Sequence, residues 1–299
     1  DLALCHVETP VAEAGGPYAA YPSFNAPPQI LDAIAKLGYD ACTTASNHTI
    51  DRGTAGLERT LDALDEAGLE HTGSYRTRAD AEEVLIMDTP AARVAVIEAT
   101  YALNGLVPDE PWQVDMLDAD AMIAKARQAR EEGADIVLGA VHAGDEYTDY
   151  ANAQQQDVAH KLADSGEFSL IYGHHSHSVQ PIEKYKDTWI VYGLGNGVTE
   201  LSPVYDVNNE GLTIRAQFAA ANVAVQLLKG EGNGCHLHAI VADISNFTGG
   251  EKLLGHFIGS NHVAHANSRK CVSLGKRANH HEIGMTREQR DRVFIRERR

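Results

Sequence analysis

The chain has 299 residues, a formal net charge of −17 at pH 7 and 43% hydrophobic residues. This length accommodates one large domain or two small ones, and the composition is that of an ordinary globular protein rather than a disordered or fibrous one. The excess of acidic residues argues against a nucleic-acid partner, because binding a phosphate backbone needs clustered Lys and Arg. No apolar run reaches the roughly 18 residues of a membrane span, so none is expected in this chain.

The first two thirds of the chain repeat one unit, an amphipathic helix followed by a glycine and a short apolar strand. Helices are predicted over 27–37, over the turn-spaced Leu57, Leu61 and Leu64, over 119–132 and over 153–164. Gly38, Gly68, Gly133 and Gly166 follow these helices, which is typical of left-handed C-caps. Strands are predicted over 2–7, 39–45, 136–141 and 168–172. This alternation indicates an α/β fold with parallel strands.

The last third of the chain has a different pattern. Segments 188–192, 211–218 and 222–228 alternate apolar and polar residues, as half-buried antiparallel strands do. We predict one domain over residues 1–230 and a C-terminal extension of uncertain structure over 231–299. The Arg-rich end, 287–299, is predicted to be a solvated helix or a frayed terminus rather than a functional basic patch.

The four cysteines are far apart in the sequence and show no C-x-x-C spacing, so a structural zinc knuckle is not expected. Cys5 and Cys42 fall in predicted strands of one sheet and could form a disulfide, as could Cys235 and Cys271. Unpaired buried thiols are the alternative, and the sequence does not choose between the two.

Each predicted strand of the first two thirds ends in residues that can bind a metal ion. These are Glu8, the run from Asn47 and His48 to Asp51, His142 with Asp145 and Glu146, and finally His174, His175 and His177. In α/β sheets, ligands gather where strand carboxyl ends meet the following loops, so these residues are predicted to share one site. Imidazole, carboxylate and amide oxygen together favour Zn, Mn or Fe over Ca or Mg. The His175-x-His177 spacing suits an extended loop whose alternate side chains point the same way.

Six stretches in the first 200 residues resemble, in order, the bacterial CapA family of poly-gamma-glutamate capsule synthesis proteins. They are HVETP (6–10), FNAPP (24–28), ASNHTIDRG (45–53), VHAGDEY (141–147), GHHSHSVQPIE (173–183) and VYGLGN (191–196). The resemblance implies the calcineurin-like metallophosphatase fold, an α/β/β/α sandwich of two mixed sheets flanked by helices. In the family an earlier strand ends in Gly-Asp and supplies a metal ligand. The chain starts after that point, so this N-terminal strand is expected to be missing here.

The same resemblance implies a centre of two divalent ions at one edge of the sandwich. Carried over by position, the metal ligands are Glu8, Asn47, His142, His175 and His177. His48 is similar to the superfamily histidine that protonates the leaving oxygen, and Asp51 is expected to orient it. His174, Asp145, Glu146 and Asn196 are expected around the ligands. A solvated loop pair is the alternative for Asp145 and Glu146, as turn chemistry is for Asn196.

The function that the resemblance implies is a metal-dependent phosphoesterase-like hydrolase in capsule, poly-gamma-glutamate or other cell-envelope polymer metabolism. Its substrate would be an anionic small molecule or polymer, and components of a capsule polymer synthase would be its partners. It would act outside the cytoplasm or at the cell envelope. Because a fold does not fix a function, two alternatives stay open. One is a non-catalytic accessory protein that binds polyanionic chains, and the other is an amide hydrolase with the same metal site.

Overall fold

The computed structural model describes residues 1–198, 211–219, 222–229, 240–244 and 295–297. The helices are α1 (Gln29–Lys36), α2 (Gly53–Ala67), α3 (Arg78–Glu82), α4 (Ala119–Glu131) and α5 (Ala153–Asp164). The strands are β1 (Leu2–His6), β2 (Ala41–Thr43), β3 (Glu70–Thr72), β4 (Leu85–Asp88), β5 (Arg93–Thr100), β6 (Ile136–His142), β7 (Leu170–His174), β8 (Ile182–Tyr185), β9 (Thr188–Val191), β10 (Leu212–Ala219), β11 (Asn222–Lys229), β12 (Ile240–Ile244) and β13 (Ile295–Glu297).

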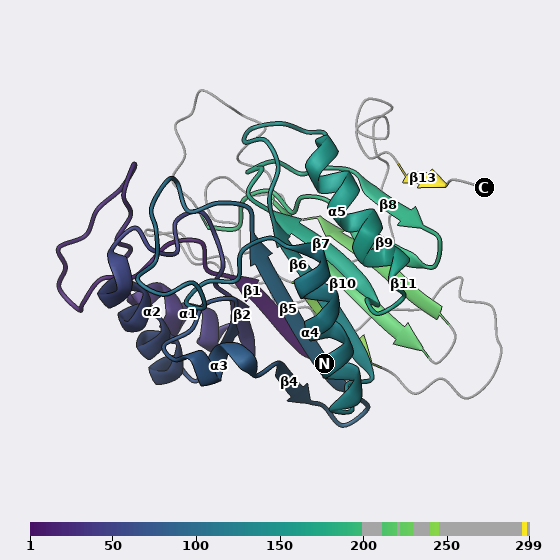
Figure 1. Ribbon diagram of the computed structural model, residues 1–299, viewed down its shortest axis with the longest axis horizontal. Helices are drawn as coiled ribbons and strands as arrows, with labels where there is room; N and C mark the ends of the chain where they lie inside the picture. Colours follow the sequence, from purple (N-terminus) through teal and green to yellow (C-terminus); the bar gives the residue numbers. More distant parts are fainter. Residues whose placement is uncertain (199–210, 220–221, 230–239, 245–294, 298–299) are drawn as a thin grey trace, which may run out of the picture.

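Two mixed β-sheets form the centre of the molecule (Figure 1). The strand order is β11-β10-β12-β1-β2-β3 in the first sheet and β13-β8-β9-β7-β6-β5-β4 in the second. Strands β1, β2 and β3 are parallel, and so are β5, β6, β7 and β9. The prediction of parallel strands is therefore confirmed for these central strands. The antiparallel pairing predicted for the last third of the chain is confirmed for β8–β9 and β10–β11. The pair β4–β5 is antiparallel as well, because short connections can join only antiparallel neighbours.

Three apolar layers hold the sandwich together. Between the two sheets lie buried side chains such as Leu4, Val96, Leu138 and Ile214. Helices α1 and α2 cover the outer face of the first sheet through one buried cluster, and α4 and α5 cover the outer face of the second through another (Figure 1). This arrangement confirms the predicted α/β/β/α sandwich.

The predicted helix ends are also confirmed. Gly38, Gly68, Gly133 and Gly166 all have positive φ angles, between 74° and 94°. A residue without a Cβ adopts this left-handed conformation at little cost. The conformation turns the chain from the helix toward the next strand. The strand predicted over 39–45 is shorter than expected, since only Ala41–Thr43 pairs as a strand.

Two strands come from the segment predicted as a C-terminal extension. Strand β12 lies between β10 and β1 in the first sheet, parallel to β10 and antiparallel to β1. Strand β13 pairs with β8, so Ile295–Glu297 of the Arg-rich end is a strand and the prediction of a helix or frayed terminus is wrong there. Backbone pairing with strand β8 makes these three residues a strand, which the local sequence pattern does not indicate. The proposed division at residue 230 stays a prediction.

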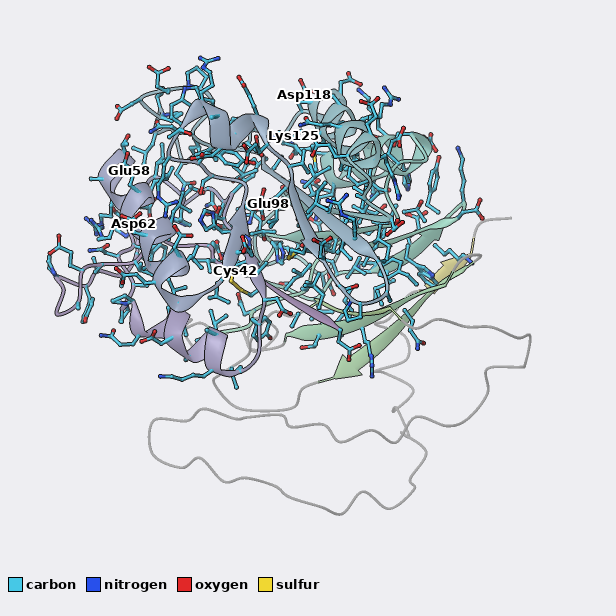
Figure 2. The ribbon with its side chains drawn as sticks, turned by 90° about the horizontal axis from the view of Figure 1, so that it is seen from below. Cys42, Glu58, Asp62, Glu98, Asp118 and Lys125 are labelled. Carbon is cyan, nitrogen blue, oxygen red and sulfur yellow. A yellow bond between two sulfur atoms is a disulfide. The ribbon has the colours of Figure 1, made fainter. Side chains whose placement is uncertain are left out.

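A disulfide joins Cys5 in β1 to Cys42 in β2, which pair in register and have Cα atoms 4.4 Å apart (Figure 2). The sequence left this pairing open. Cys235 and Cys271 lie outside the described residues. Among the helices that the structure describes, none combines the length and the apolar character needed to cross a lipid bilayer.

Candidate metal centre

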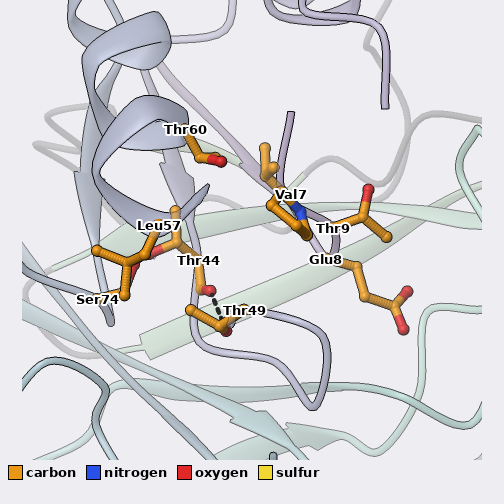
Figure 3. A pocket seen from close by; sticks show the side chains of 9 residues that line it. Val7, Glu8, Thr9, Thr44, Thr49, Leu57, Thr60 and Ser74 are labelled. Carbon is orange, nitrogen blue, oxygen red and sulfur yellow. Dashed lines mark hydrogen bonds between the residues drawn. The ribbon is translucent and has the colours of Figure 1, made fainter. Parts of the chain in front are cut away.

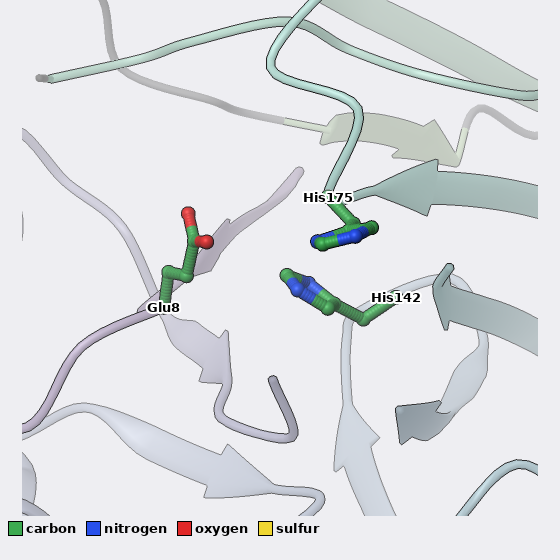
Figure 4. Close-up of side chains that lie close together, drawn as sticks. All are labelled: Glu8, His142 and His175. Carbon is green, nitrogen blue, oxygen red and sulfur yellow. The ribbon is translucent and has the colours of Figure 1, made fainter. Parts of the chain in front are cut away.

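The candidate metal centre lies where strand ends from both sheets meet. Glu8 follows β1 of the first sheet, whereas His142 ends β6 and His175 follows β7 in the second sheet. One donor atom from each of these three residues lies within 4.8 Å of the other two. Figure 4 shows the imidazole rings of His142 and His175 side by side with the Glu8 side chain nearby, and the ring centroids are 5.0 Å apart. Residues up to 167 positions apart in the sequence thus form one donor set.

Asn47 joins this donor set through its amide oxygen. Its Oδ1 atom lies 2.8 Å from Nε2 of His142. Its Nδ2 group donates a hydrogen bond of 3.2 Å to Oδ1 of Asn104. The second contact orients the amide, because the nitrogen must face the Asn104 oxygen. The oxygen of Asn47 is therefore directed at His142.

The protonation states suit a metal site. Burial, helped by neighbouring histidines, holds the pKa of His142 well below its usual range. Burial also lowers the pKa of His175 to about 4. For Glu8, burial by itself raises the pKa, but the charges of His177, His6 and His48 outweigh it and the net shift is downward. Two neutral imidazoles beside an ionised carboxylate are the forms that bind transition metals.

Two buried atoms of this set, each able to bind a metal ion, make no hydrogen bond. They are Oε1 of Glu8 and Nδ1 of His175. Oε1 of Glu8 has an ionic contact with His177, whose Nε2 atom is 3.5 Å away. Burying a polar atom without a hydrogen bond is costly, and almost all such atoms in folded proteins are paired. A divalent cation would satisfy both atoms, so the residues present fit one.

The loop that carries His175 and His177 is not extended, and that prediction is wrong. His175 has a φ angle of 87° and His177 one of 49°, both in the left-handed region. Residues other than glycine seldom adopt this region, and such strained positions cluster at functional sites. The turned loop keeps the two rings 6.4 Å apart while His174 stays in strand β7.

His177 lies at the rim of the centre rather than among the closest donors. Its Nδ1 atom is 2.8 Å from Oδ1 of Asn196, and the Asn196 Nδ2 group donates back to the His177 carbonyl at 3.3 Å. Tyr147 stacks on the ring with a centroid distance of 5.6 Å. The double contact shows how Asn196 fixes the orientation of His177, with Nε2 toward Glu8.

His174 points to a different neighbour. Its ring stacks on His6, with centroids 4.2 Å apart and planes 10° from parallel. His6 in turn lies 3.0 Å from His142. His174 is therefore one layer behind the donor set.

His48 and Asp51 form a buried pair beside the donor set. Nδ1 of His48 lies 2.8 Å from Oδ2 of Asp51, and the same oxygen accepts a 2.8 Å hydrogen bond from the backbone N–H of Phe24. The Phe24 ring meets the His48 ring edge-on at 4.7 Å. Burial lowers the pKa of His48, but the hydrogen bond and charge of Asp51 outweigh it and the net shift is upward. Asp51 thus orients the ring and favours its protonated form.

A small pocket lies behind the backbone of Glu8, next to helix α2 (Figure 3). Threonines 9, 44, 49 and 60 line it together with Val7, Pro10, Leu57 and Ser74. In Figure 3 the Glu8 carboxylate extends away from this pocket. The hydroxyl of Ser46 donates to the Glu8 carbonyl, and that of Thr49 donates to the Thr44 carbonyl at 2.8 Å. The pocket therefore marks the hydrogen-bonded support of the loop that presents Asn47 and is not the metal centre.

Asp145 and Glu146 are exposed on the loop after β6. Their charges add small upward contributions to the pKa values of His175 and His48, in which burial is the largest influence. This placement agrees with the solvated loop pair considered as their alternative.

Residues 1–200 match the family described as bacterial capsule synthesis protein PGA_cap. The chain belongs to this family. It is 29% identical over 180 residues to the capsule biosynthesis protein CapA of Bacillus anthracis, covering 58% of this chain and 43% of that protein. A probable polyglutamine synthesis accessory protein of Mycobacterium tuberculosis is 29% identical over 219 residues, covering 67% and 56%. This capsule synthesis family member thus spans about half the length of the curated relatives that it matches.

Solved structures similar to this family member include the calcineurin-like phosphoesterase YfkN from Bacillus subtilis. The two share 13% sequence identity with a TM-score of 0.44, and the match covers 79% of this chain and 93% of the other.

Sequence reasoning missed three polar residues that this capsule synthesis family member places at the centre: His6, Glu98 and Asn104. Glu98 lies inside strand β5 and is 1% exposed, and His6 is the last residue of strand β1. A charged or polar residue within an otherwise apolar, buried strand was the signal that could have found them, since such residues are buried only with partners. Asn104 lies in a loop, where its positive φ of 51° is visible only in the structure.

Proposed function

We propose that the chain is a metal-dependent phosphoesterase-like hydrolase that acts in the metabolism of a capsule or poly-gamma-glutamate polymer. The main support for this proposal is that the oriented His48–Asp51 pair lies beside a set of possible metal ligands. This set includes Glu8, His142 and His175. A binding site needs the donors alone. A hydrolase also needs a group that can give a proton to a leaving oxygen.

His48 is the proton donor in this proposal. Its Nδ1–H faces the Asp51 carboxylate at 2.8 Å, which leaves Nε2 to exchange a proton with a bound substrate. Phe24 packs edge-on against the ring and limits its rotation. A positioned acid of this kind contributes roughly 10²–10⁴-fold to the rate of a hydrolysis.

We further propose that the centre holds two divalent ions, of Mn, Zn or Fe. Glu8, Asn47, His142 and His175 would be the closest ligands, and His177 would join them from the rim. When bound, such ions would supply Lewis acidity and positive charge for a phosphoryl group. The mixture of imidazole nitrogen, carboxylate and amide oxygen supports these metals over Ca or Mg.

The substrate in this proposal is an anionic small molecule or polymer that carries a phosphoester. The centre is rich in acidic groups: Glu8 is half-buried in it, the Asp51 side chain is buried beside it, and Asp145 and Glu146 lie near its rim. Attraction of an anion would therefore depend on the bound cations, since like charges repel at short range. Proteins of a capsule polymer synthase are the partners that we propose.

We propose an extracellular or cell-envelope location. The Cys5–Cys42 disulfide supports it, because disulfides persist in oxidising compartments and are rare in the cytosol.

A non-catalytic role in binding polyanionic chains is the second candidate. The relative from Mycobacterium tuberculosis favours it, being described as an accessory protein of polyglutamine synthesis. An accessory protein of this kind would use the cations to hold carboxylates and would not need His48.

One experiment separates the two roles. Metal content and hydrolysis of bis-p-nitrophenyl phosphate are measured for the wild type and for His48→Ala, with Mn or Zn added. We expect bound metal in both proteins and loss of roughly 10²-fold or more in turnover in the variant. His71→Gln, in β3 and outside the centre, is the matched control and keeps wild-type turnover. Bound metal without turnover in the wild type would reject the hydrolase and favour the accessory role.

A further inference from the structure

Helix α2 begins directly after the His48–Asp51 pair, and its N-cap residue, Arg52, holds the loop that carries Phe24. Nε of Arg52 donates a 3.0 Å hydrogen bond to the Phe24 carbonyl, and Nη2 donates one of 2.5 Å to the Ser23 carbonyl. One planar guanidinium thus binds two successive carbonyls, which fixes the orientation of that piece of backbone.

Asp51 binds the same two loop residues. The Phe24 N–H donates to Oδ2 of Asp51 at 2.8 Å, and the Ser23 hydroxyl donates to the Asp51 carbonyl at 3.0 Å. Four hydrogen bonds therefore form a clamp between residues 23–24 and residues 51–52, which are 27 to 29 positions apart. Because Oδ2 of Asp51 also faces Nδ1 of His48 at 2.8 Å, the clamp and the His48–Asp51 pair share one oxygen atom.

The clamp sets where the Phe24 ring lies. This ring meets the ring of His48 edge-on, with centroids 4.7 Å apart and planes at 84°. Asp51 holds the His48 ring at one atom, Nδ1, and a ring held at one atom can still swing about that contact. The Phe24 ring limits this movement from the side. Arg52 therefore acts on the placement of His48 through Phe24.

The base of the loop is attached to α2 by other residues. Nε of Arg59 donates to the Val11 carbonyl at 2.8 Å, and the Thr60 hydroxyl accepts a 3.0 Å hydrogen bond from the Val11 N–H. These contacts do not involve the clamp. Loss of the Arg52 contacts should therefore free the backbone at Phe24 and leave the loop attached to the helix.

We propose that Arg52 is a positioning residue for His48. By binding the carbonyls of Ser23 and Phe24, it holds the Phe24 ring against the imidazole and keeps Nε2 of His48 in one place relative to a bound substrate. The inference rests on the proposed function in one respect, namely that His48 gives its proton to the leaving oxygen. A misplacement of about 1 Å at a reacting group can cost roughly 10²-fold in rate, so we expect removal of Arg52 to cost up to that amount.

The first readout is the dependence of turnover on the leaving group, with Mn or Zn added. The nitro group stabilises p-nitrophenolate as an anion, whereas phenolate depends more on receiving a proton, so a misplaced acid slows the loss of phenolate more. We expect Arg52→Met to lose about 3–10-fold in turnover of bis-p-nitrophenyl phosphate and about 10–100-fold with diphenyl phosphate. Equal losses with both substrates would overturn the inference, because a general loosening of the fold does not distinguish leaving groups.

A double variant tests whether Arg52 acts through His48. The variant with both His48→Ala and Arg52→Met should turn over diphenyl phosphate no more slowly than His48→Ala alone, because the residue that Arg52 positions is already absent. Additive losses would contradict the inference.

The second readout needs neither metal nor turnover. The rings of Phe24 and His48 are close enough for a nuclear Overhauser contact between their protons, and Phe24→Leu and His48→Ala assign it. We expect this ring contact in the wild type and its loss in Arg52→Met. A ring contact of wild-type strength in Arg52→Met would overturn the inference.

Gly56→Ala displaces Arg52 and keeps its charge. A Cβ added at Gly56 would lie 2.2 Å from Cβ of Arg52, so one of the two residues must shift. We expect a weaker ring contact and a larger loss of turnover with diphenyl phosphate than with bis-p-nitrophenyl phosphate, as in Arg52→Met. A weaker ring contact with wild-type turnover of both substrates would overturn the inference, because the place of the Phe24 ring would then not matter.

The matched control is Arg76→Met. Arg76 pairs with Asp62 and Asp65 of the same helix at 2.9 and 2.7 Å, so the same change of side chain is made outside the clamp. Its turnover of both substrates and its ring contact should equal those of the wild type. Urea unfolding checks that all variants are folded. Should the wild type turn over neither substrate, the proposed function fails, and the ring contact alone decides whether Arg52 positions His48.

Discussion

Nε2 of His142 lies 2.8 Å from Oδ1 of Asn47, and the two residues come from different sheets, one at the end of β6 and the other in the loop after β2. The amide orientation of Asn47 is set by Asn104, and the ring orientation of His142 by its contact with His6. Nε2 of His142 and the amide oxygen of Asn47 are thereby directed at each other where strand ends of the two sheets meet. This pair ties the packing of the sandwich to the chemistry of the centre.

The first prediction concerns this pair. Asn47→Leu keeps the side chain about the same size but removes the amide oxygen, so we expect metal affinity to fall at least about 10–100-fold. Metal titration followed by calorimetry measures it. Asn104→Ala, which frees the Asn47 amide and removes a 3.4 Å contact with Nδ1 of His48, should show a smaller loss. Equal affinity of Asn47→Leu and wild type would remove Asn47 from the ligands.

The second prediction concerns Asp51. Asp51→Asn keeps an oxygen that can accept from His48 and from the Phe24 N–H, but it removes the charge. We expect turnover of a phosphodiester to fall by roughly 10²-fold or more, since a positioned acid contributes that much. Metal content should be unchanged, which atomic absorption checks. Loss of metal in parallel with activity would show that Asp51 supports the ligands instead.

The third prediction concerns the Cys5–Cys42 disulfide. It links residues 37 positions apart across neighbouring strands. Replacing both cysteines by Ala should lower the free energy of unfolding by about 2–4 kcal/mol, mainly because the unfolded chain gains conformational entropy without the cross-link. Urea unfolding without reductant measures this. Under strong reductant the wild type should approach the variant, and an unchanged difference would contradict the role of the cross-link.

The fourth prediction is a pH dependence from His71. Burial holds the pKa of His71 below its usual 6.5, although Asp65 at 3.1 Å partly opposes the shift. Below pH 6.5 the unfolded chain takes up the proton before the folded protein does, so His71 makes folding less favourable as the pH falls. His71→Gln has no such proton to bind. Its free energy of unfolding, relative to wild type, should rise between about pH 7.5 and 5. A pH-independent difference would reject this assignment.

The fifth prediction concerns Gly73, which has a φ of 105° and contacts the loop that bears Asn47. A Cβ there would meet the Glu98 carboxylate and the Ala45 nitrogen. Gly73→Ala should therefore cost about 2–5 kcal/mol from backbone strain and overpacking combined. At Gly38 the φ is 89° but no atom lies within 4 Å of an added Cβ, so Gly38→Ala should cost only about 1–2 kcal/mol. If urea unfolding shows equal losses of stability for Gly73→Ala and Gly38→Ala, a steric clash at Gly73 is excluded.

Much of the candidate site could be predicted because its residues follow strands directly. Asn47, His142 and His175 each come after an apolar segment whose boundaries are visible in the sequence. Parallel strands bring such ends to one edge of a sheet, so local sequence patterns were enough to predict that these residues lie close together. The roles of these residues stay predictions until metal binding and turnover are measured.

The loop at His175 shows where local patterns fail. The H-x-H spacing fits an extended chain, but the structure turns both histidines into the left-handed region. That conformation costs energy that only contacts from elsewhere can offset. Asn196 and Tyr147, which hold His177, come from two other loops.

The sequence by itself determined α1, α2, α4 and α5, their glycine caps and the polar residues at the strand ends, because helix and strand periodicities and turn chemistry are local properties of the chain. Tertiary structure decided which strands pair, that β12 lies beside β1, and that Glu98 reaches His142 through His6. The contacts of β12 with β1, of Glu98 with His6 and of His6 with His142 join residues 92 to 240 positions apart. Their physical basis is the packing of two sheets on one core, and no short-range pattern encodes it.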